Sequence, residues 1–277
     1  MDVLRYRAFT CSLDGSGNPA GVVLDASGMT DDDMLAIAAE VGYSETSFVV
    51  AGEGSYRVRY FSPVAEVDFC GHATIATAVA LAEDGAGAGE LLFLTNVGEI
   101  EVTVVEADSG NSATLMSVPP MVAAPQELLE LLGALGWELS DLAADLPLGL
   151  AFAGLWHPIV WANSRDRLAD LDYDFDGLKD LMVENGWGTV SLLYREAEDL
   201  IHSRNAFPVG GVIEDPATGA AAAALGGFLR DHQLLPEDGK FVVIQGEDMD
   251  MPCRIVVDAS GDEGVAVTGT AEMMAAP

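Results

Sequence analysis

The sequence is poor in positive charge. Its 277 residues include only 12 Lys and Arg against 45 Asp and Glu, which gives a formal net charge of -33. Nucleic acid and anionic lipid are bound through clustered Lys and Arg, so we expect neither as a partner. The charge itself indicates solubility, leaves open whether the cytoplasm is salty, and does not point to a particular function.

Cysteine and long apolar runs are also scarce. The three cysteines, Cys11, Cys70 and Cys253, are an odd and widely spaced set, which favours reduced thiols over a disulfide framework. No apolar run approaches the roughly 20 residues that a membrane span needs. The N-terminus lacks the basic and apolar regions of a signal peptide. We therefore expect a cytoplasmic protein that does not enter a membrane.

The common motifs of hydrolases, nucleotide-triphosphatases and metal sites are missing. The chain has no His-Glu-x-x-His, Cys-x-x-Cys, Gly-x-Ser-x-Gly or Gly-Lys-Ser/Thr sequence. Its four histidines, at positions 72, 157, 202 and 232, lie far apart. Cys70 and His72 are close enough to supply two ligands, but the pattern gives such a site little support. We expect no metal.

What is present is an alternation of short strands with a few helices. Apolar periodicity predicts helices over residues 31–41, 71–83, 126–135, 175–185 and 220–229. The expected strands cover residues 21–24, 46–50, 56–61, 91–95, 99–106, 113–118, 156–161, 189–195, 200–203, 240–245, 254–258 and 265–270. Thr30 is expected to cap the first helix, and Gly17-Asn18-Pro19 to form a turn.

A domain boundary is expected at Pro119-Pro120, because neither proline can donate a hydrogen bond to a ladder. The boundary separates an N-terminal domain of residues 1–118 from a C-terminal domain of residues 119–277. The last strand could return to the first domain.

The helix that begins at Gly71 is apolar on every side apart from two threonines, which is typical of a helix enclosed by a sheet. The unpaired N–H groups of its first turn suit an anion such as a carboxylate. Residues 220–229 form a second such helix. Each helix follows a Phe, a Pro, an acidic residue, and then a Gly and a Thr. This repetition predicts a duplicated α+β fold with a cleft between the two helix starts.

Three titratable residues beside turns are candidates for chemistry, and each has a structural alternative. Glu45 enters an apolar strand, which is costly for a carboxylate unless it is paired or functional. It could instead be an exposed turn acid or a cap. His72 could be a structural histidine in a buried helix, and Asp215 could be an N-cap. The residues alone leave these alternatives open.

Four motifs, in order along the chain, resemble the phenazine-biosynthesis PhzF-like family, which shares the diaminopimelate epimerase fold. They are Gly17-Asn18-Pro19-Ala20-Gly21-Val22-Val23, Ser44-Glu45-Thr46-Ser47-Phe48, Phe61-Ser62-Pro63 followed by Cys70-Gly71-His72-Ala73-Thr74, and Glu214-Asp215-Pro216-Ala217-Thr218-Gly219. The resemblance implies two similar domains, each a strongly bent mixed sheet around a central apolar helix. It also implies an active site in the interdomain cleft and a homodimer.

The chemistry that the resemblance implies is proton transfer without a cofactor. The family enzyme shifts a hydrogen and a double bond in trans-2,3-dihydro-3-hydroxyanthranilate, so a small carboxylate-bearing substrate is expected. Glu45 matches the family's general acid/base, His72 the residue that orients the substrate, and Asp215 an acid near the substrate's polar substituents. The implied substrate-binding residues are Ser44, Gly71, Thr218, Gly219 and Ala220, with backbone N–H groups of Gly71 and Gly219 facing the substrate carboxylate.

Two departures from the family pattern leave alternatives open. Ala220 stands where the family often has Ser, so a hydroxyl contact is lost and a different substrate is plausible. Cys70 stands where diaminopimelate epimerase has one of its two thiols, but the second position, near Pro216 and Ala217, holds no thiol. We interpret Cys70 as a packing residue. The remaining alternatives are an amino-acid epimerase that uses Glu45 with His72, and a non-catalytic binding protein.

Overall fold

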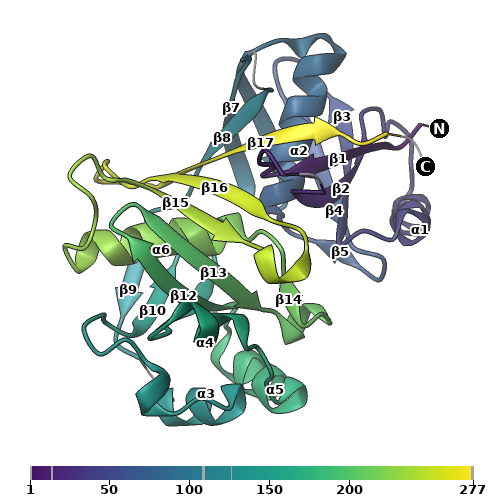
Figure 1. The fold of residues 1–277 in the computed structure, drawn as a ribbon. Coiled ribbons are helices and arrows are strands. Elements are labelled where there is room, and N and C mark those ends of the chain that lie inside the picture. The colour runs from purple at the N-terminus through teal and green to yellow at the C-terminus, as the bar shows by residue number, and fades with distance from the viewer. Residues whose placement is uncertain (1, 14, 108–109, 126, 276–277) are drawn as a thin grey trace. The chain divides into compact units, whose positions relative to one another are not determined.

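The computed structural model describes residues 2–13, 15–107, 110–125 and 127–275, and the chain divides into two compact units (Figure 1). The first unit is Met1–Met116 with Thr268–Pro277, and the second is Ser117–Val267. The break after Met116 falls two residues before the boundary expected from the sequence. Most of the last strand, β17 (Ala266–Met273), belongs to the first unit.

The first unit is a mixed sheet with helices packed on it. Its elements are β1 (Leu4–Ala8), β2 (Asn18–Val23), α1 (Asp31–Val41), β3 (Glu45–Ala51), β4 (Tyr56–Phe61), β5 (Glu66–Val67), α2 (Gly71–Leu81), the π-helical turn η1 (Ala82–Ala86), β6 (Gly89–Thr95), β7 (Gly98–Val105) and β8 (Ser112–Met116). Strand β2 pairs with β1 antiparallel and with β3 parallel, and β4 pairs with β3 and β5 antiparallel and with β6 parallel. Helix α2 packs against β1, β2, β3, β7 and β8.

The second unit is built in the same way. Its elements are β9 (Met121–Ala123), α3 (Leu128–Leu135), η2 (Leu139–Asp141), β10 (Gly149–Phe152), β11 (Trp156–Trp161), α4 (Arg165–Ala169), α5 (Phe175–Asn185), β12 (Val190–Ala197), β13 (Leu200–Ala206), η3 (Pro208–Gly210), β14 (Glu214–Asp215), α6 (Gly219–Asp231), β15 (Lys240–Gln245), η4 (Glu247–Met249) and β16 (Cys253–Asp258). Helix α6 packs against β9, β10, β11 and β16.

The order and direction of strand pairing repeat between the units. In the first unit, β1 pairs with β2 antiparallel, β2 with β3 parallel, β3 with β4 antiparallel, and β4 with β6 parallel. In the second, β10, β11, β12, β13 and β15 pair in the same sequence of directions. A two-residue strand, β5 or β14, precedes the buried helix in each. Each unit is therefore one copy of the same mixed-sheet arrangement.

Helices α2 and α6 are almost wholly buried, and both begin without a side-chain cap. Every residue of α2 from His72 to Leu81 is buried, as is α6 from Ala221 to Leu229. Neither helix has a side-chain hydrogen bond at its N-cap. The exposed helix α1 is capped by Thr30 as expected, and α5 is capped by Asp174. The two buried helices thus begin with backbone N–H groups that no cap side chain satisfies.

The expected turn at Gly17-Asn18-Pro19 was wrong. Strand β2 begins at Asn18, and Pro19 pairs with Arg7 of β1. The parallel ladder with β3 starts only at Ala20, so the missing N–H of Pro19 removes no bond from that ladder. The start of the helix expected at residue 126 lies outside the described residues, and α3 begins at Leu128.

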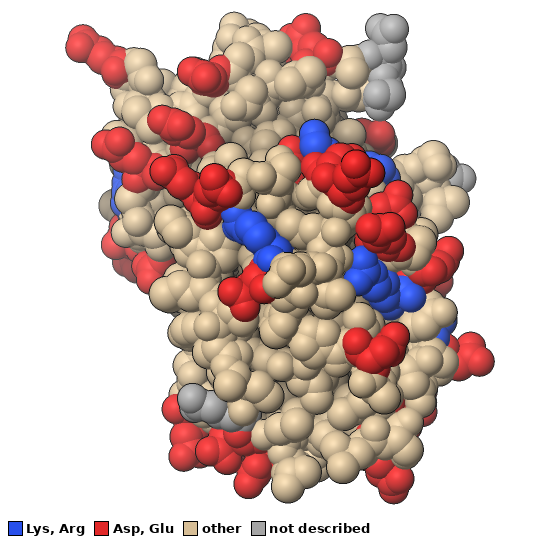
Figure 2. Space-filling view, turned by 90° about the vertical axis from the view of Figure 1, so that its left-hand side faces the viewer, with Lys and Arg blue, Asp and Glu red and all other residues tan. Residues whose placement is uncertain are grey.

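Acidic side chains are spread over the face that Figure 2 shows, with few basic ones among them. Several basic residues pair with acids: Arg59 with Asp31 and Glu66, Arg165 with Asp248, Arg167 with Asp170, and Lys240 with Asp258. Such pairs leave few positive charges to gather into a patch. None of the helices in the described part of the chain is both long and apolar enough to cross a membrane.

The interior of the second unit contains a histidine whose burial affects its pKa. His157, on β11, is 1% exposed, and its Nδ1 lies 2.9 Å from the Thr189 hydroxyl oxygen. Its Nε2 has no hydrogen-bond partner among the described residues. Burial lowers the pKa of His157 to about 4, because an imidazolium there would be desolvated.

We expect this histidine to make stability fall with falling pH between about 6.5 and 4. In that window the unfolded chain binds a proton at residue 157 and the folded chain does not, so the folded state loses up to about 3 kcal/mol. Below pH 4 the folded form is protonated too, and the dependence ends. The free energy of unfolding, measured by urea denaturation, should therefore fall less over this window in His157→Asn than in the parent.

The matched control is His232→Asn, which changes an exposed histidine of the same unit and should keep the parent's pH profile. Parallel profiles for the parent and His157→Asn would contradict the assignment.

Candidate functional site

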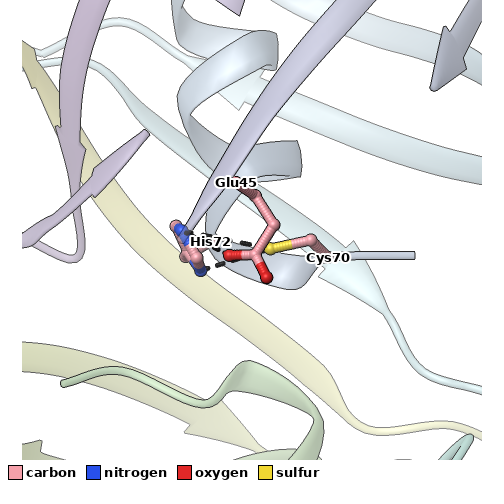
Figure 3. Close-up of side chains that lie close together, drawn as sticks. All are labelled: Glu45, Cys70 and His72. Atoms are coloured by element: carbon pink, nitrogen blue, oxygen red, sulfur yellow. Dashed lines mark hydrogen bonds and ion pairs between the residues drawn. The ribbon is translucent and has the colours of Figure 1, made fainter. Parts of the chain in front are cut away.

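Three proton-exchanging side chains meet at the start of helix α2 (Figure 3). The Glu45 Oε2 lies 3.5 Å from the His72 Nε2, and the Cys70 Sγ lies 3.2 Å from the His72 Nδ1. His72 is 4% exposed and Cys70 9%, whereas the Glu45 side chain is 16% exposed. The imidazole therefore lies close to both a carboxylate and a thiol, and the carboxylate is the group most open to solvent.

The first residues of strand β3 and of helix α2 place these side chains. Glu45 is the first residue of β3 and pairs with Ala20 of β2. Cys70 is the N-cap of α2, with extended backbone, and His72 is the second residue of the helix. Because side chains alternate along a strand, the side chain of Glu45 points to the same face of β3 as that of Ser47.

Hydroxyl groups fix helix α2 against the sheet. The Ser47 Oγ lies 2.6 Å from the Thr77 Oγ1, and the Tyr60 hydroxyl lies 2.7 Å from the Thr74 Oγ1. Thr74 donates its own proton to the Cys70 carbonyl, so Tyr60 is the donor to Thr74, and burial raises the pKa of Tyr60 and keeps it protonated. These bonds account for both threonines of an otherwise apolar helix, and they set its rotation about its axis.

The remaining predicted residues of the first unit lie beside the three side chains. Ser44 is exposed, and its Oγ lies 3.5 Å from the His72 Nε2. Gly71 is the first residue of α2. The N–H groups of a helix's first turn have no partner inside the helix, and the helix dipole favours an anion there.

In the second unit, the residues predicted at the start of α6 form one hydrogen-bonded turn. The Thr218 hydroxyl donates to the Asp215 Oδ2 at 2.6 Å. Gln245, at the end of β15, donates to the Asp215 carbonyl at 2.6 Å and accepts from the Thr218 N–H at 3.2 Å. Asn205 donates to the same Gln245 oxygen at 3.0 Å. Gly219 is the buried first residue of α6, and Ala220 the half-buried second.

An ion pair holds the strand that carries Asp215. Arg204 of β13 bonds both carboxylate oxygens of Glu214, with an Nε to Oε2 distance of 2.9 Å. Both side chains are below 10% exposed. Removing one partner of such a buried pair would leave an uncompensated charge, so the pair strongly specifies the β13–β14 pairing.

The structure therefore groups the predicted residues into two sets. Ser44, Glu45, Gly71 and His72 belong to the first unit, and Asp215, Thr218, Gly219 and Ala220 to the second. The alternative that Asp215 is the N-cap of α6 was wrong, because Thr218 occupies that position and donates to Asp215. Sequence reasoning missed Gln245 and Asn205, which hold this turn. No local signal marks them, since they meet only through the parallel pairing of β13 with β15.

The chain is similar to known proteins over nearly its whole length. The model of the PhzC-PhzF family, phenazine biosynthesis-like proteins, matches residues 6–276. An uncharacterised isomerase of Bacillus subtilis, YfhB, is 34% identical over 281 residues, which cover 98% of this chain and 95% of the relative. The trans-2,3-dihydro-3-hydroxyanthranilate isomerase of Pseudomonas aeruginosa is 29% identical over 253 residues, which cover 88% of this chain and 86% of the relative. A crystal structure of a PhzF-family phenazine biosynthesis protein of Bacillus anthracis matches with a TM-score of 0.85 and 28% identity. The match covers 99% of this chain and 96% of that one.

The position of Glu45 depends on a glycine in the adjacent strand. Gly21 of β2 pairs with Thr46 of β3, and a Cβ at residue 21 would lie 2.6 Å from the Thr46 Oγ1 and 3.2 Å from its Cβ. Changing the Thr46 rotamer cannot relieve the contact between the added Cβ and the Thr46 Cβ, because rotation about χ1 does not move the Cβ atom. We expect Gly21→Ala to push β2 and β3 apart, to lower the free energy of unfolding by about 1–3 kcal/mol, and to displace Glu45. Chemical denaturation measures the loss of stability.

Gly133→Ala is the control for this substitution. Gly133 is exposed in α3, and a Cβ there meets nothing within 4 Å. The same chemical change should stabilise the protein by about 0.5–1 kcal/mol there. A Gly21→Ala protein as stable as the parent would show that the two strands are not held in contact as described.

Proposed function

Because the chain belongs to the PhzC-PhzF family of phenazine biosynthesis-like proteins, we propose that it is an isomerase that moves a proton within a small carboxylate-bearing substrate without a cofactor. The names of its relatives support the isomerase class, since those from Bacillus subtilis and Pseudomonas aeruginosa are both named isomerases. The observation that carries the proposal is the contact between the Glu45 carboxylate and the His72 imidazole.

In the proposed reaction, Glu45 is the general base and then the general acid. Its carboxylate takes a proton from a substrate carbon, and the electrons of the broken C–H bond shift to form a new double bond. The same carboxyl group then returns the proton to another carbon, so that atoms and charge balance. A single carboxylate can perform both steps when the substrate stays bound between them. The partial exposure of Glu45 supports this role, because a substrate must reach the base.

His72 is proposed to orient the reacting groups. Its Nε2 lies 3.5 Å from Glu45, and the ring is held in the first turn of a helix whose rotation is fixed by hydroxyl bonds. A base held by rigid elements loses little entropy on reaching the reactive geometry. The helix start supports binding of the substrate carboxylate at the Gly71 N–H.

The second unit is proposed to contribute binding groups for polar substituents. Asp215, Thr218 and the first-turn N–H groups of α6, at Gly219 and Ala220, form a rigid polar turn supported by Gln245. A dihydro-hydroxyanthranilate-like substrate, of the kind in the name of the Pseudomonas aeruginosa relative, carries amino and hydroxyl groups that would suit these partners. Ala220 offers no hydroxyl, which favours a substrate with one polar contact fewer at that position.

An amino-acid epimerase is the second candidate, and one contact favours it. The Cys70 thiol lies 3.2 Å from the His72 Nδ1, so a second proton-exchanging group accompanies Glu45. An epimerase would return the proton to the carbon that lost it. Such a reaction changes optical rotation and leaves the double bonds in place, whereas the isomerase moves a double bond and changes ultraviolet absorption.

We expect Glu45→Gln to abolish incorporation of solvent deuterium into trans-2,3-dihydro-3-hydroxyanthranilate or a related small carboxylate turned over by the parent. The amide keeps the shape of the side chain and removes its basicity, so the rate should fall by at least about 10²-fold. Incorporation in D₂O is measured by mass spectrometry of the product.

Glu53→Gln, at an exposed glutamate of the same unit, is the matched control and should exchange at the parent rate. Unchanged incorporation in Glu45→Gln would overturn the role of Glu45. Tight binding of such carboxylates by the parent, with no proton exchange at any pH, would instead favour a non-catalytic binding protein.

A further inference from the structure

The three side chains at the start of α2 form a mixed set of potential metal ligands. Glu45, Cys70 and His72 present an oxygen, a sulfur and a nitrogen, and each ligand atom lies within 4.8 Å of the other two. Within the described residues, these three form the one such cluster of potential metal ligands. The sequence predicted no metal because it placed only Cys70 and His72 together, and the fold adds the third ligand from β3.

We propose that this cluster binds a soft divalent cation, with Zn²⁺ as the representative ion, and that the bound ion blocks proton transfer by Glu45. The inhibition rests on the proposed function, whereas the binding does not. Zinc in this role is an inhibitor that competes for the site, and the proposed isomerisation does not use it.

The distances suit a tetrahedral ion. Bond lengths of about 2.0 Å to nitrogen or oxygen and 2.3 Å to sulfur place ligand atoms roughly 3.3–3.6 Å apart. The His72 Nε2 lies 3.5 Å from the Glu45 Oε2 and 4.0 Å from the Cys70 Sγ. Its Nδ1 lies 3.2 Å from the same sulfur, so both ring nitrogens are near the Cys70 thiol. The Cys70 sulfur and the Glu45 oxygen lie within 4.8 Å of each other, so side-chain movements on the order of an ångström bring all three ligands to zinc-binding distances.

The ligand set selects the class of ion. Thiolate and imidazole favour zinc and similar ions over magnesium and calcium, which prefer oxygen. Three protein ligands leave the fourth position of zinc open for water or a substrate carboxylate. Cys70 is the N-cap residue of α2, at the end of the helix where the dipole favours an anionic ligand. Glu45, the most exposed of the three, gives the ion a route from solvent.

Binding and proton transfer compete for the same lone pairs. Zinc needs a deprotonated thiol, a neutral imidazole and an ionised carboxylate. Zinc binding should therefore release protons and tighten as the pH rises. A Glu45 carboxylate that ligates zinc gives a lone pair to the ion and has its negative charge partly neutralised, which makes it a poor base toward a substrate carbon.

The proposal is tested by titrating the purified protein with Zn²⁺ in a calorimeter, in buffers of different ionisation enthalpy, and with Co²⁺ in a spectrophotometer. We expect one saturable site per chain, with proton release and a thiolate-to-cobalt absorption band. Cys70→Ser should weaken zinc binding by at least about tenfold, since even outer-shell substitutions cost about 10–100-fold, and it should lose the band. Excess Mg²⁺ should not displace the zinc.

Cys11→Ser is the matched control, because Cys11 is a half-buried cysteine of the same unit outside the cluster, and it should bind zinc as the parent does. Equal binding by the parent and Cys70→Ser, or weak binding at many sites, would overturn the proposal and assign the zinc to surface carboxylates. If Cys70→Ser does not fold, Glu45→Gln decides, because it removes an anionic ligand and should also weaken binding.

Activity separates this proposal from the proposed function. Zinc at saturation should stop deuterium incorporation by the parent, and a chelator should restore it. Zinc binding without any exchange activity would retain the metal site and reject the isomerase. Exchange that persists at full zinc occupancy would reject the inhibition.

Discussion

The hydrogen bond between Ser47 and Thr77 is the constraint on which the candidate site depends. It joins the strand that carries Glu45 to the helix that carries His72, and its oxygen atoms lie 2.6 Å apart. An all-apolar helix against an apolar sheet can slide or rotate at little cost, because dispersion contacts are not directional. A buried hydroxyl pair is directional, and leaving either hydroxyl unpaired costs about 1–3 kcal/mol. The bond thus converts a nondirectional contact into a defined register, and that register brings the carboxylate to the imidazole.

The second unit solves the same problem with different residues. Helix α6 has Ala222 and Leu225 where α2 has its threonines, and its anchor is the Gln245 amide at the end of β15. Gln245 bonds the backbone at both ends of the turn that precedes the helix, so it fixes Asp215 and Thr218 together. The pairing order is common to both units, yet the polar anchor is not. The repeated arrangement of strands therefore constrains where a helix begins, and individual side chains decide how firmly it is held.

Much of the fold follows from local pattern. Helices α1 and α5 and strands β4, β11 and β15 have the bounds that periodicity predicted, because each has clear caps or turn residues on both sides. Strand β1 was not predicted, since Arg5 and Arg7 alternate with its apolar residues over only five positions. Strands β9 and β10 are shorter still. The turn expected at Pro19 failed because a proline can open a strand whose parallel ladder starts one residue later.

Glu45 and His72 were found through a family resemblance, whereas Gln245 acts only through tertiary pairing, which no local window contains.

Cys70 changes most between sequence and structure. As a residue before a buried helix, it is predicted to pack, and its burial agrees with that. Its sulfur nevertheless lies against the imidazole that also faces Glu45, so packing and chemistry use the same position. A carboxylate, an imidazole and a thiol share one property, a lone pair that binds either a proton or a cation. Grouping them at a helix start provides an effective place to exchange protons, and for the same physical reason it provides a place for a soft metal. The two uses exclude each other, because every lone pair that binds a metal is one that cannot accept a proton.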